Sequence, residues 1–158
     1  MAGVVKERLD DLRFLGGIYQ EMENQFGAAD YEEPLNAFFA DLESAHLDYF
    51  LNEHAPDGSS WPPLAASTIA RKGHDRILFE TGKLEKQMAR SGAGIREVTH
   101  RGLIFGNDLF YSIFHQEPQS GRLPKREHVG MSDELLQVVV DSVADHTVES
   151  LKSSSGGK

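Results

Sequence analysis

The centre of the chain carries two ordered motifs, and the first of them reads Gly58-Ser59-Ser60-Trp61-Pro62-Pro63-Leu64-Ala65-Ala66-Ser67-Thr68-Ile69. The second follows a lysine and reads Ile77-Leu78-Phe79-Glu80-Thr81-Gly82-Lys83-Leu84. Just before the first motif, Pro56 biases its predecessor away from helical backbone and Asp57-Gly58 supplies turn residues, so a preceding helix is expected to end there. The two prolines then favour a stiff, extended segment after Trp61. A short helix is expected from about Leu64 to Lys72.

Helical periodicity is strongest in the segment before this turn. Pro34 suits the first turn of a helix, and the charges of Glu32 and Glu33 favour its N-terminus. From there, apolar and aromatic residues recur at three- and four-residue steps: Leu35, Phe38, Phe39, Leu42, Ala45, His46, Tyr49 and Phe50. This stripe predicts an amphipathic helix that is buried along one face, and its most buried residues should include Phe38, Leu42 and Tyr49.

Helices are also expected at both ends of the chain. Residues 4–26 have a helix-like apolar spacing that is interrupted by Gly16-Gly17. Near the C-terminus, Ser132 has the chemistry of an N-cap. The apolar stripe after it predicts a final helix to about residue 151 through Leu136, Val139, Val140, Val143, Val148 and Leu151.

Between these helices the pattern favours short strands. Residues 95–100 and 102–106 are expected to form two strands joined at Arg101-Gly102, and residues 125–131 suit another strand. Thr81 is a candidate cap for a helix that runs to about Arg90, and residues 109–115 suit either a short helix or a strand. The predicted class is α+β, with amphipathic helices at both ends packed on a small, mainly antiparallel central sheet.

Length and composition favour a single domain. A chain of 158 residues can bury roughly 70% of the surface that its unfolded form exposes. We expect one domain over residues 1–152, with residues 1–30 as an N-terminal helical extension, and a disordered tail over residues 153–158. The absence of cysteine excludes disulfides and thiolate chemistry. No apolar stretch approaches the ~20 residues of a bilayer span, so no membrane association is expected.

The net charge of −9 is unevenly distributed. Residues 1–60 hold 13 acidic and 3 basic residues, residues 61–130 hold 7 and 11, and residues 131–158 hold 5 and 2. The three parts therefore contribute −10, +4 and −3. Unlike charges on one small subunit suit head-to-tail self-association, because opposite patches steer and orient partners. The alternative is that these charges only keep the surface solvated.

In this order the motifs resemble the signature of the phage virion morphogenesis (tail-completion) family. That signature is a Pro-Asp-Gly turn, a Trp-x-Pro-Leu segment, a Ser-Thr-Ile step, a lysine and an Ile-Leu-x-x-Thr-Gly-x-Leu box. Tyr111 and His115-Gln116 resemble the family's Tyr-x-x-x-His-Gln step. The stretch from Arg126 to Ser132 resembles its closing segment in part, but Glu127-His128 stands where the family has a proline and an aromatic residue. The resemblance covers roughly residues 35–151.

The resemblance implies a non-enzymatic structural protein that completes the phage tail and joins it to the head at the neck or tail end. It implies a homo-oligomeric ring whose partners are tail-tube and head-connector proteins, located in the virion and, during assembly, in the host cytoplasm. The residues expected to form interfaces or structural motifs are Trp61, Pro63, Leu64, Gly82, Leu84, Tyr111, His115 and Arg126. Trp61 is either a core residue or an anchor toward a neighbouring subunit. Arg126 either braces loops through its five donors or is solvated.

No residue pattern indicates a catalytic, metal or cofactor site. The seven histidines include no His-x-x-x-His pair and no His-Glu-x-x-His helix. There is no Gly-x-Ser-x-Gly elbow and no Ser-x-x-Lys pair at a helix start. The alternative function is sequence-independent, non-specific binding of DNA or other nucleic acid through a basic middle segment, whose members are Arg71, Lys72, Arg76, Lys83, Lys86, Arg90, Arg96 and Arg101. A solvated face or a subunit contact would explain the same cluster.

Overall fold

The computed structural model describes residues 30–90, 93–117 and 123–155. Its elements are, in order, α2 (Glu32–Asn52), α3 (Ala66–Lys72), α4 (Lys83–Ala89), β1 (Ile95–Thr99), β2 (Gly102–Gly106), α5 (Ile113–Gln116) and α6 (Asp133–Ser155). Helices flank a small antiparallel sheet, which confirms the α+β class. The helix predicted over residues 4–26 lies outside the described residues.

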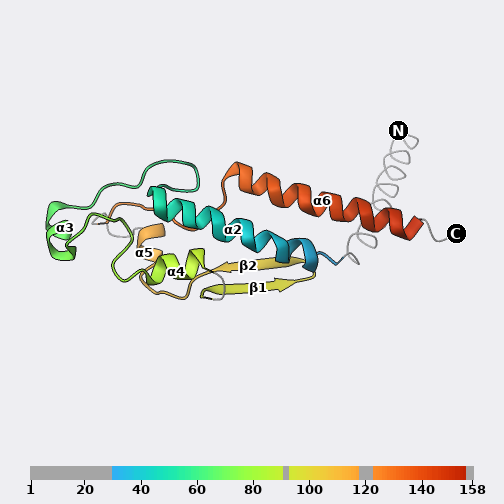
Figure 1. Ribbon diagram of the computed structural model, residues 1–158, viewed down its shortest axis with the longest axis horizontal. Coiled ribbons are helices and arrows are strands. Elements are labelled where there is room, and N and C mark those ends of the chain that lie inside the picture. The colour runs from blue at the N-terminus through green and yellow to red at the C-terminus, as the bar shows by residue number, and fades with distance from the viewer. Residues whose placement is uncertain (1–29, 91–92, 118–122, 156–158) are drawn as a thin grey trace, which may run out of the picture.

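Helix α2 is the centre of the fold. Helix α6 packs along one side of it, and α4 and the β-hairpin lie along the other (Figure 1). The predicted stripe is buried, since Phe38 and Leu42 are each 3% exposed and Tyr49 is 4% exposed. Phe38 and Leu42 pack against Leu135 of α6, whereas Tyr49 belongs to a second cluster that contains Trp61. Side chains of this kind each contribute about 1.5–3 kcal/mol when fully buried, so this one face of α2 joins both halves of the core.

The two predicted central strands form the hairpin. Strands β1 and β2 pair antiparallel from Ile95 opposite Gly106 to Thr99 opposite Gly102. Phe105 of β2 packs on the buried His46 ring of α2, with 4.7 Å between ring centroids. Arg96 of β1 donates to Glu43 of α2 at 2.6 Å, and both side chains are largely buried. The hairpin is therefore attached to α2 by ring packing and by one ion pair.

Helix α6 begins at the predicted N-cap, but the face that it buries differs from the predicted apolar stripe. Ser132 is the N-cap, because its Oγ accepts the Leu135 N–H at 3.1 Å. The buried apolar residue of α6 is Leu135, whereas four members of the predicted stripe are 44–51% exposed: Leu136, Val140, Val148 and Leu151. Among the described elements only α2 packs broadly against α6, so none of them covers the side of α6 that is turned away from α2. Helical backbone continues to Ser155, into the segment expected to be a disordered tail.

Two further local expectations are wrong. Residues 125–131 form no strand, because side chains rather than a β-ladder satisfy their backbone groups. Thr81 does not cap α4, since Gly82 occupies the N-cap position with left-handed backbone (φ 72°). The open choice for residues 109–115 resolves as the short helix α5. No helix in the described part of the chain is long and apolar enough to cross a membrane.

Candidate functional site: a groove lined by the signature residues

One groove gathers most of the predicted site residues. It has a volume of about 920 Å³ and lies between α3, the loop before α4, the start of α5 and the segment after residue 122. Seven of the eight predicted residues line it: Pro63, Leu64, Gly82, Leu84, Tyr111, His115 and Arg126. Motifs that are up to 63 positions apart in the chain therefore meet on one surface, which we call the signature groove.

The lining combines apolar and basic side chains. Apolar surface comes from residues that include Pro63, Leu64, Leu78, Leu84 and Tyr111. Four cationic side chains line the groove, against a single carboxylate, Glu80. The four are Arg71, Lys72, Lys83 and Arg126. The groove is thus suited to a ligand that is partly apolar and partly anionic.

Gly82 is required where the Thr-Gly-x-Leu box turns into α4. Its φ of +72° is left-handed, a conformation that residues with a Cβ rarely adopt. A Cβ here would also lie 3.1 Å from Cε2 of Phe79. The Phe79 ring is in turn covered by the Arg76 guanidinium, with 3.6 Å from Cζ to the ring centroid. The glycine therefore lets the wall of the groove close tightly over Phe79.

Arg126 ties the wall of the groove to the proline segment. Its side chain is 5% exposed, and its Nε and Nη2 donate to the carbonyl oxygens of Pro62 and Pro63 at 2.9 and 3.0 Å. Burial lowers the pKa of Arg126. Prolines supply acceptors but no N–H donors, so a donor-only guanidinium complements this segment. Of the two alternatives for Arg126, the hydrogen bonds and burial favour the brace over a solvated side chain.

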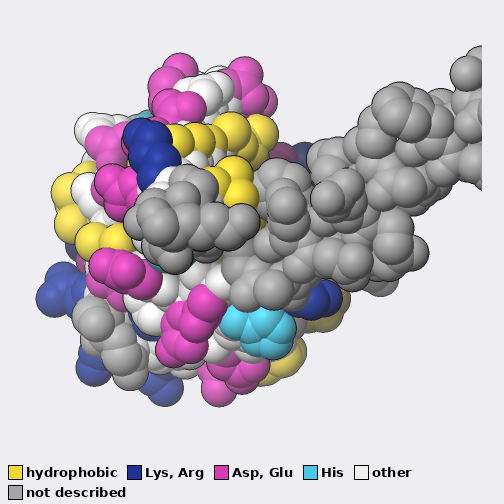
Figure 2. All heavy atoms as spheres, turned by 90° about the vertical axis from the view of Figure 1, so that its right-hand side faces the viewer, with side chains coloured by type: hydrophobic (Ala, Val, Ile, Leu, Met, Phe, Trp, Pro, Cys, Tyr) yellow, Lys and Arg dark blue, Asp and Glu magenta, His cyan; other side chains and the backbone are white. Residues whose placement is uncertain are grey.

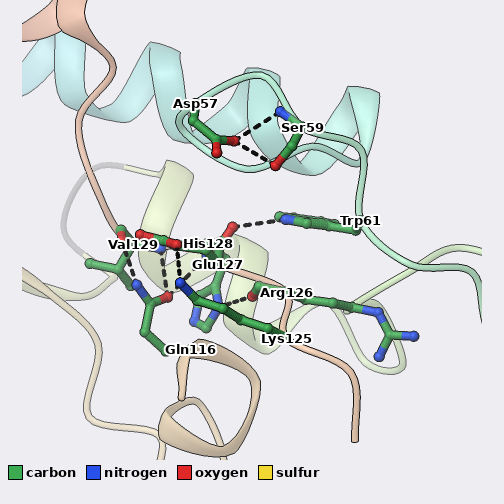
Figure 3. A network of polar contacts seen from close by, with 9 residues as sticks. All are labelled: Asp57, Ser59, Trp61, Gln116, Lys125, Arg126, Glu127, His128 and Val129. Atoms are coloured by element: carbon green, nitrogen blue, oxygen red, sulfur yellow. Dashed lines mark hydrogen bonds and ion pairs between the residues drawn. The ribbon is translucent and has the colours of Figure 1, made fainter. Parts of the chain in front are cut away.

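Trp61 lies behind the groove and supports it. It is 5% exposed, stacks edge-to-face on Phe50 at 5.5 Å, and donates from Nε1 to the Glu127 carbonyl at 2.8 Å. Figure 3 shows the indole pointing at the segment that carries Arg126 and Glu127. Of the two alternatives for Trp61, the structure selects the core residue.

Gln116 holds the closing segment in place of a β-ladder. Its Oε1 accepts the N–H groups of His128 and Val129 at 3.0 and 3.1 Å, and its Nε2 donates to the Val129 carbonyl at 2.7 Å (Figure 3). The family-like Tyr-x-x-x-His-Gln step contains Gln116, so the sequence carried a signal for it, although it is not among the eight predicted residues. His115 of the same step accepts the Arg126 N–H through its backbone carbonyl at 2.8 Å.

His128 is a structural residue that sequence reasoning missed. It is fully buried, and its Nδ1 lies 3.1 Å from the Arg126 carbonyl, which can only accept. Nε2 is then the acceptor for the Ser112 hydroxyl at 2.7 Å. Burial lowers the pKa of His128 to about 4, so the ring is neutral at pH 7. No sequence signal identified it, since a histidine stands where the family has an aromatic residue.

Four of the eight members of the basic middle segment form ion pairs within the subunit: Arg71, Arg76, Arg90 and Arg96. Glu80 accepts from Arg71 at 3.0 Å, and Glu85 lies 2.8 Å from Arg76 and 3.6 Å from Arg90. These pairs neutralise much of the charge that a phosphate backbone would need, so they do not favour the nucleic-acid alternative. Within the described ranges, no three His, Asp or Glu side chains are grouped to hold a metal ion.

The model of the phage virion morphogenesis family matches residues 11–147. The chain therefore belongs to the phage virion morphogenesis family, whose members contribute to building the phage particle. No curated protein and no solved structure gives a significant match.

Proposed function

We propose that this protein completes the phage tail and makes it competent to join the head, acting as a non-enzymatic subunit of a ring at the tail end or neck. One observation carries the proposal: in a chain of the virion morphogenesis family, seven signature residues converge on one groove. They contribute apolar, basic and aromatic surface and no arrangement of nucleophile and base. Such a surface serves binding, and binding is what an assembly subunit has to do.

The mechanism in this proposal is geometric. A subunit with two unlike contact surfaces associates head to tail, and such contacts close into a ring when the rotation between neighbours allows it. The ring would present one face to tail-tube protein and the other to head-connector protein. The protein would be found in the finished virion, and in the host cytoplasm while particles assemble.

The test is deletion of the gene from a phage that encodes it, with complementation by the parent gene. We expect particles without the protein to have tails of altered length or tails that fail to join heads, counted by electron microscopy. Purified parent virions should contain the protein at the tail end or neck by immunolabelling. Normal tail length and normal head joining in the deletion would refute the proposal.

A further inference from the structure

Three groups that line the signature groove have no acidic partner among the described residues. The Nδ1 atom of His115 is buried and has no hydrogen-bond partner within the described residues. Arg126 is paired there with carbonyl oxygens and with no carboxylate. Lys83 is exposed and makes no ion pair with any described residue. An acidic group in the groove would accept from the buried His115 ring, whose unpaired nitrogen is costly, and would add a counter-charge beside Lys83 and Arg126.

The free side of α6 has the complementary chemistry. Val148 and Leu151 are 47% and 44% exposed. Asp145 and Glu149 are also exposed, four positions apart, and they make no ion pair within the described part of the chain. Residues at these spacings form adjacent stripes on a helix surface. The last turns of α6 therefore carry an apolar stripe beside an acidic one.

Size and position support contact between two copies. A helix turn of ~10 Å diameter and ~5.4 Å pitch occupies roughly 420 Å³, so a groove of about 920 Å³ admits about two turns. The groove lies at the α3 end of the molecule, and α6 ends at the other end of the long axis (Figure 1). Figure 2 views that second end, where apolar side chains lie among acidic and basic ones in the upper part of the face. One subunit cannot bring its own α6 into its own groove.

We propose that the signature groove of one subunit binds the apolar and acidic face of α6, residues 144–151, of a second copy. The inference rests on the proposed function and names the contact that would build the ring. The contact is heterologous, because it joins two different patches. The apolar residues of the groove lining favour a protein partner over nucleic acid, whose binding depends mainly on phosphate contacts with basic side chains.

Charge exchange tests this contact. Lys83→Glu places an acid at the start of α4, and Glu149→Lys places a base near the end of α6; both suit the helix dipole, so folding should be retained. We expect each single change to weaken self-association at least about tenfold in sedimentation equilibrium, because like charges then face each other. The double variant Lys83→Glu/Glu149→Lys should recover most of the parent affinity.

Two matched controls accompany these variants. Lys86→Glu reverses the same charge one turn further along α4, outside the groove lining, and Glu97→Lys reverses an exposed acid of β1. Both should leave self-association unchanged. A parent that stays monomeric, or a double variant that is no better than either single one, overturns the proposal. Loss of duplex-DNA binding in Lys83→Glu with unchanged self-association would also overturn it, in favour of a nucleic-acid ligand.

The same variants separate this inference from the proposed function. If the gene deletion blocks head joining while the charge variants neither alter self-association nor impair joining, the function stands and this contact is wrong. If the double variant restores self-association while the gene deletion leaves tail length and head joining normal, the contact stands and the function is wrong.

Discussion

Trp61 and Glu127 are 66 positions apart, and the Trp61 indole donates to the Glu127 carbonyl at 2.8 Å. This bond joins the first motif to the closing segment behind the signature groove. Trp61 lies on a stiff loop, and its side chain points into the core, where it holds the closing segment in place. The aromatic body fills the core, and its single N–H satisfies a carbonyl that has no strand partner.

Replacing Trp61 should separate these two contributions. Trp61→Phe keeps most of the apolar volume but leaves the Glu127 carbonyl without its donor, so we expect a loss of about 1–3 kcal/mol in the free energy of unfolding. Trp61→Ala should cost about 3–5 kcal/mol, because it also leaves a cavity. Urea denaturation followed by circular dichroism measures both, since the only tryptophan is removed. Equal losses in the two variants would contradict the role given to the hydrogen bond.

Arg126→Lys tests the brace on the proline segment. A lysine cannot donate to the Pro62 and Pro63 carbonyls in the fork geometry of a guanidinium, so we expect a loss of about 1–3 kcal/mol in unfolding free energy. Arg71→Lys is the matched control, because Arg71 is 64% exposed in its side chain and pairs only at the surface. The control should change stability by less than about 0.5 kcal/mol. Similar losses at both sites would refute the brace.

Phe38 and Phe110 form a matched pair of buried and exposed aromatic residues. Phe38 is 3% exposed in the core between α2 and α6, whereas Phe110 is 81% exposed. Phe38→Ala should cost about 3–5 kcal/mol and lower the melting temperature clearly. Phe110→Ala should stay within about 0.5 kcal/mol of the parent. A thermal melt of Phe38→Ala that matches the parent would show that this core assignment is wrong.

Gly130 should not tolerate a side chain. A Cβ there would lie 2.8 Å from Cγ of Pro56, so Gly130→Ala forces the closing segment away from the turn and should cost about 1–3 kcal/mol. At Gly102 an added Cβ meets nothing within 4 Å, which makes Gly102→Ala the control. Chemical denaturation should show the difference. A stable Gly130→Ala variant would mean that this segment is not packed against the turn.

Stability should fall in mild acid because two histidines are buried as neutral rings. Burial lowers the pKa of both His46 and His128 from 6.5 to about 4. Between these values the unfolded chain binds more protons than the folded one, so unfolding free energy rises with pH and falls as pH drops from 6.5 to 4. Each ring should contribute roughly 3 kcal/mol across this window.

The measurement is urea denaturation at several pH values for the parent and His46→Phe. The variant should show a smaller loss of stability between pH 6.5 and 4, because it cannot take up a proton at this site in either state. His100→Gln, at an exposed hairpin position, is the control and should follow the parent. A parent whose stability does not change across the window would refute the prediction.

Local sequence determined much of this protein. The three- and four-residue periodicity of residues 35–50 predicted the central helix and its buried face, and alternating strand residues around Arg101-Gly102 predicted the hairpin. These features follow from side-chain spacing and turn chemistry, which neighbouring residues decide. The ordered motifs also indicated the family, and seven of the eight site residues predicted from them line the groove.

Only the tertiary structure decided how the motifs are used. Periodicity located α6 but not its buried side, because α2 covers the Leu135 side and leaves Val140 exposed. The segment around His128 has strand-like composition, yet a single glutamine, Gln116, satisfies its backbone in place of a neighbouring strand. From the sequence, Trp61 could have faced either the core or a neighbouring subunit. In the structure it points into the core, where it donates to the carbonyl of Glu127, 66 positions along the chain. Contacts between residues distant in sequence depend on how whole elements pack, which local pattern does not specify.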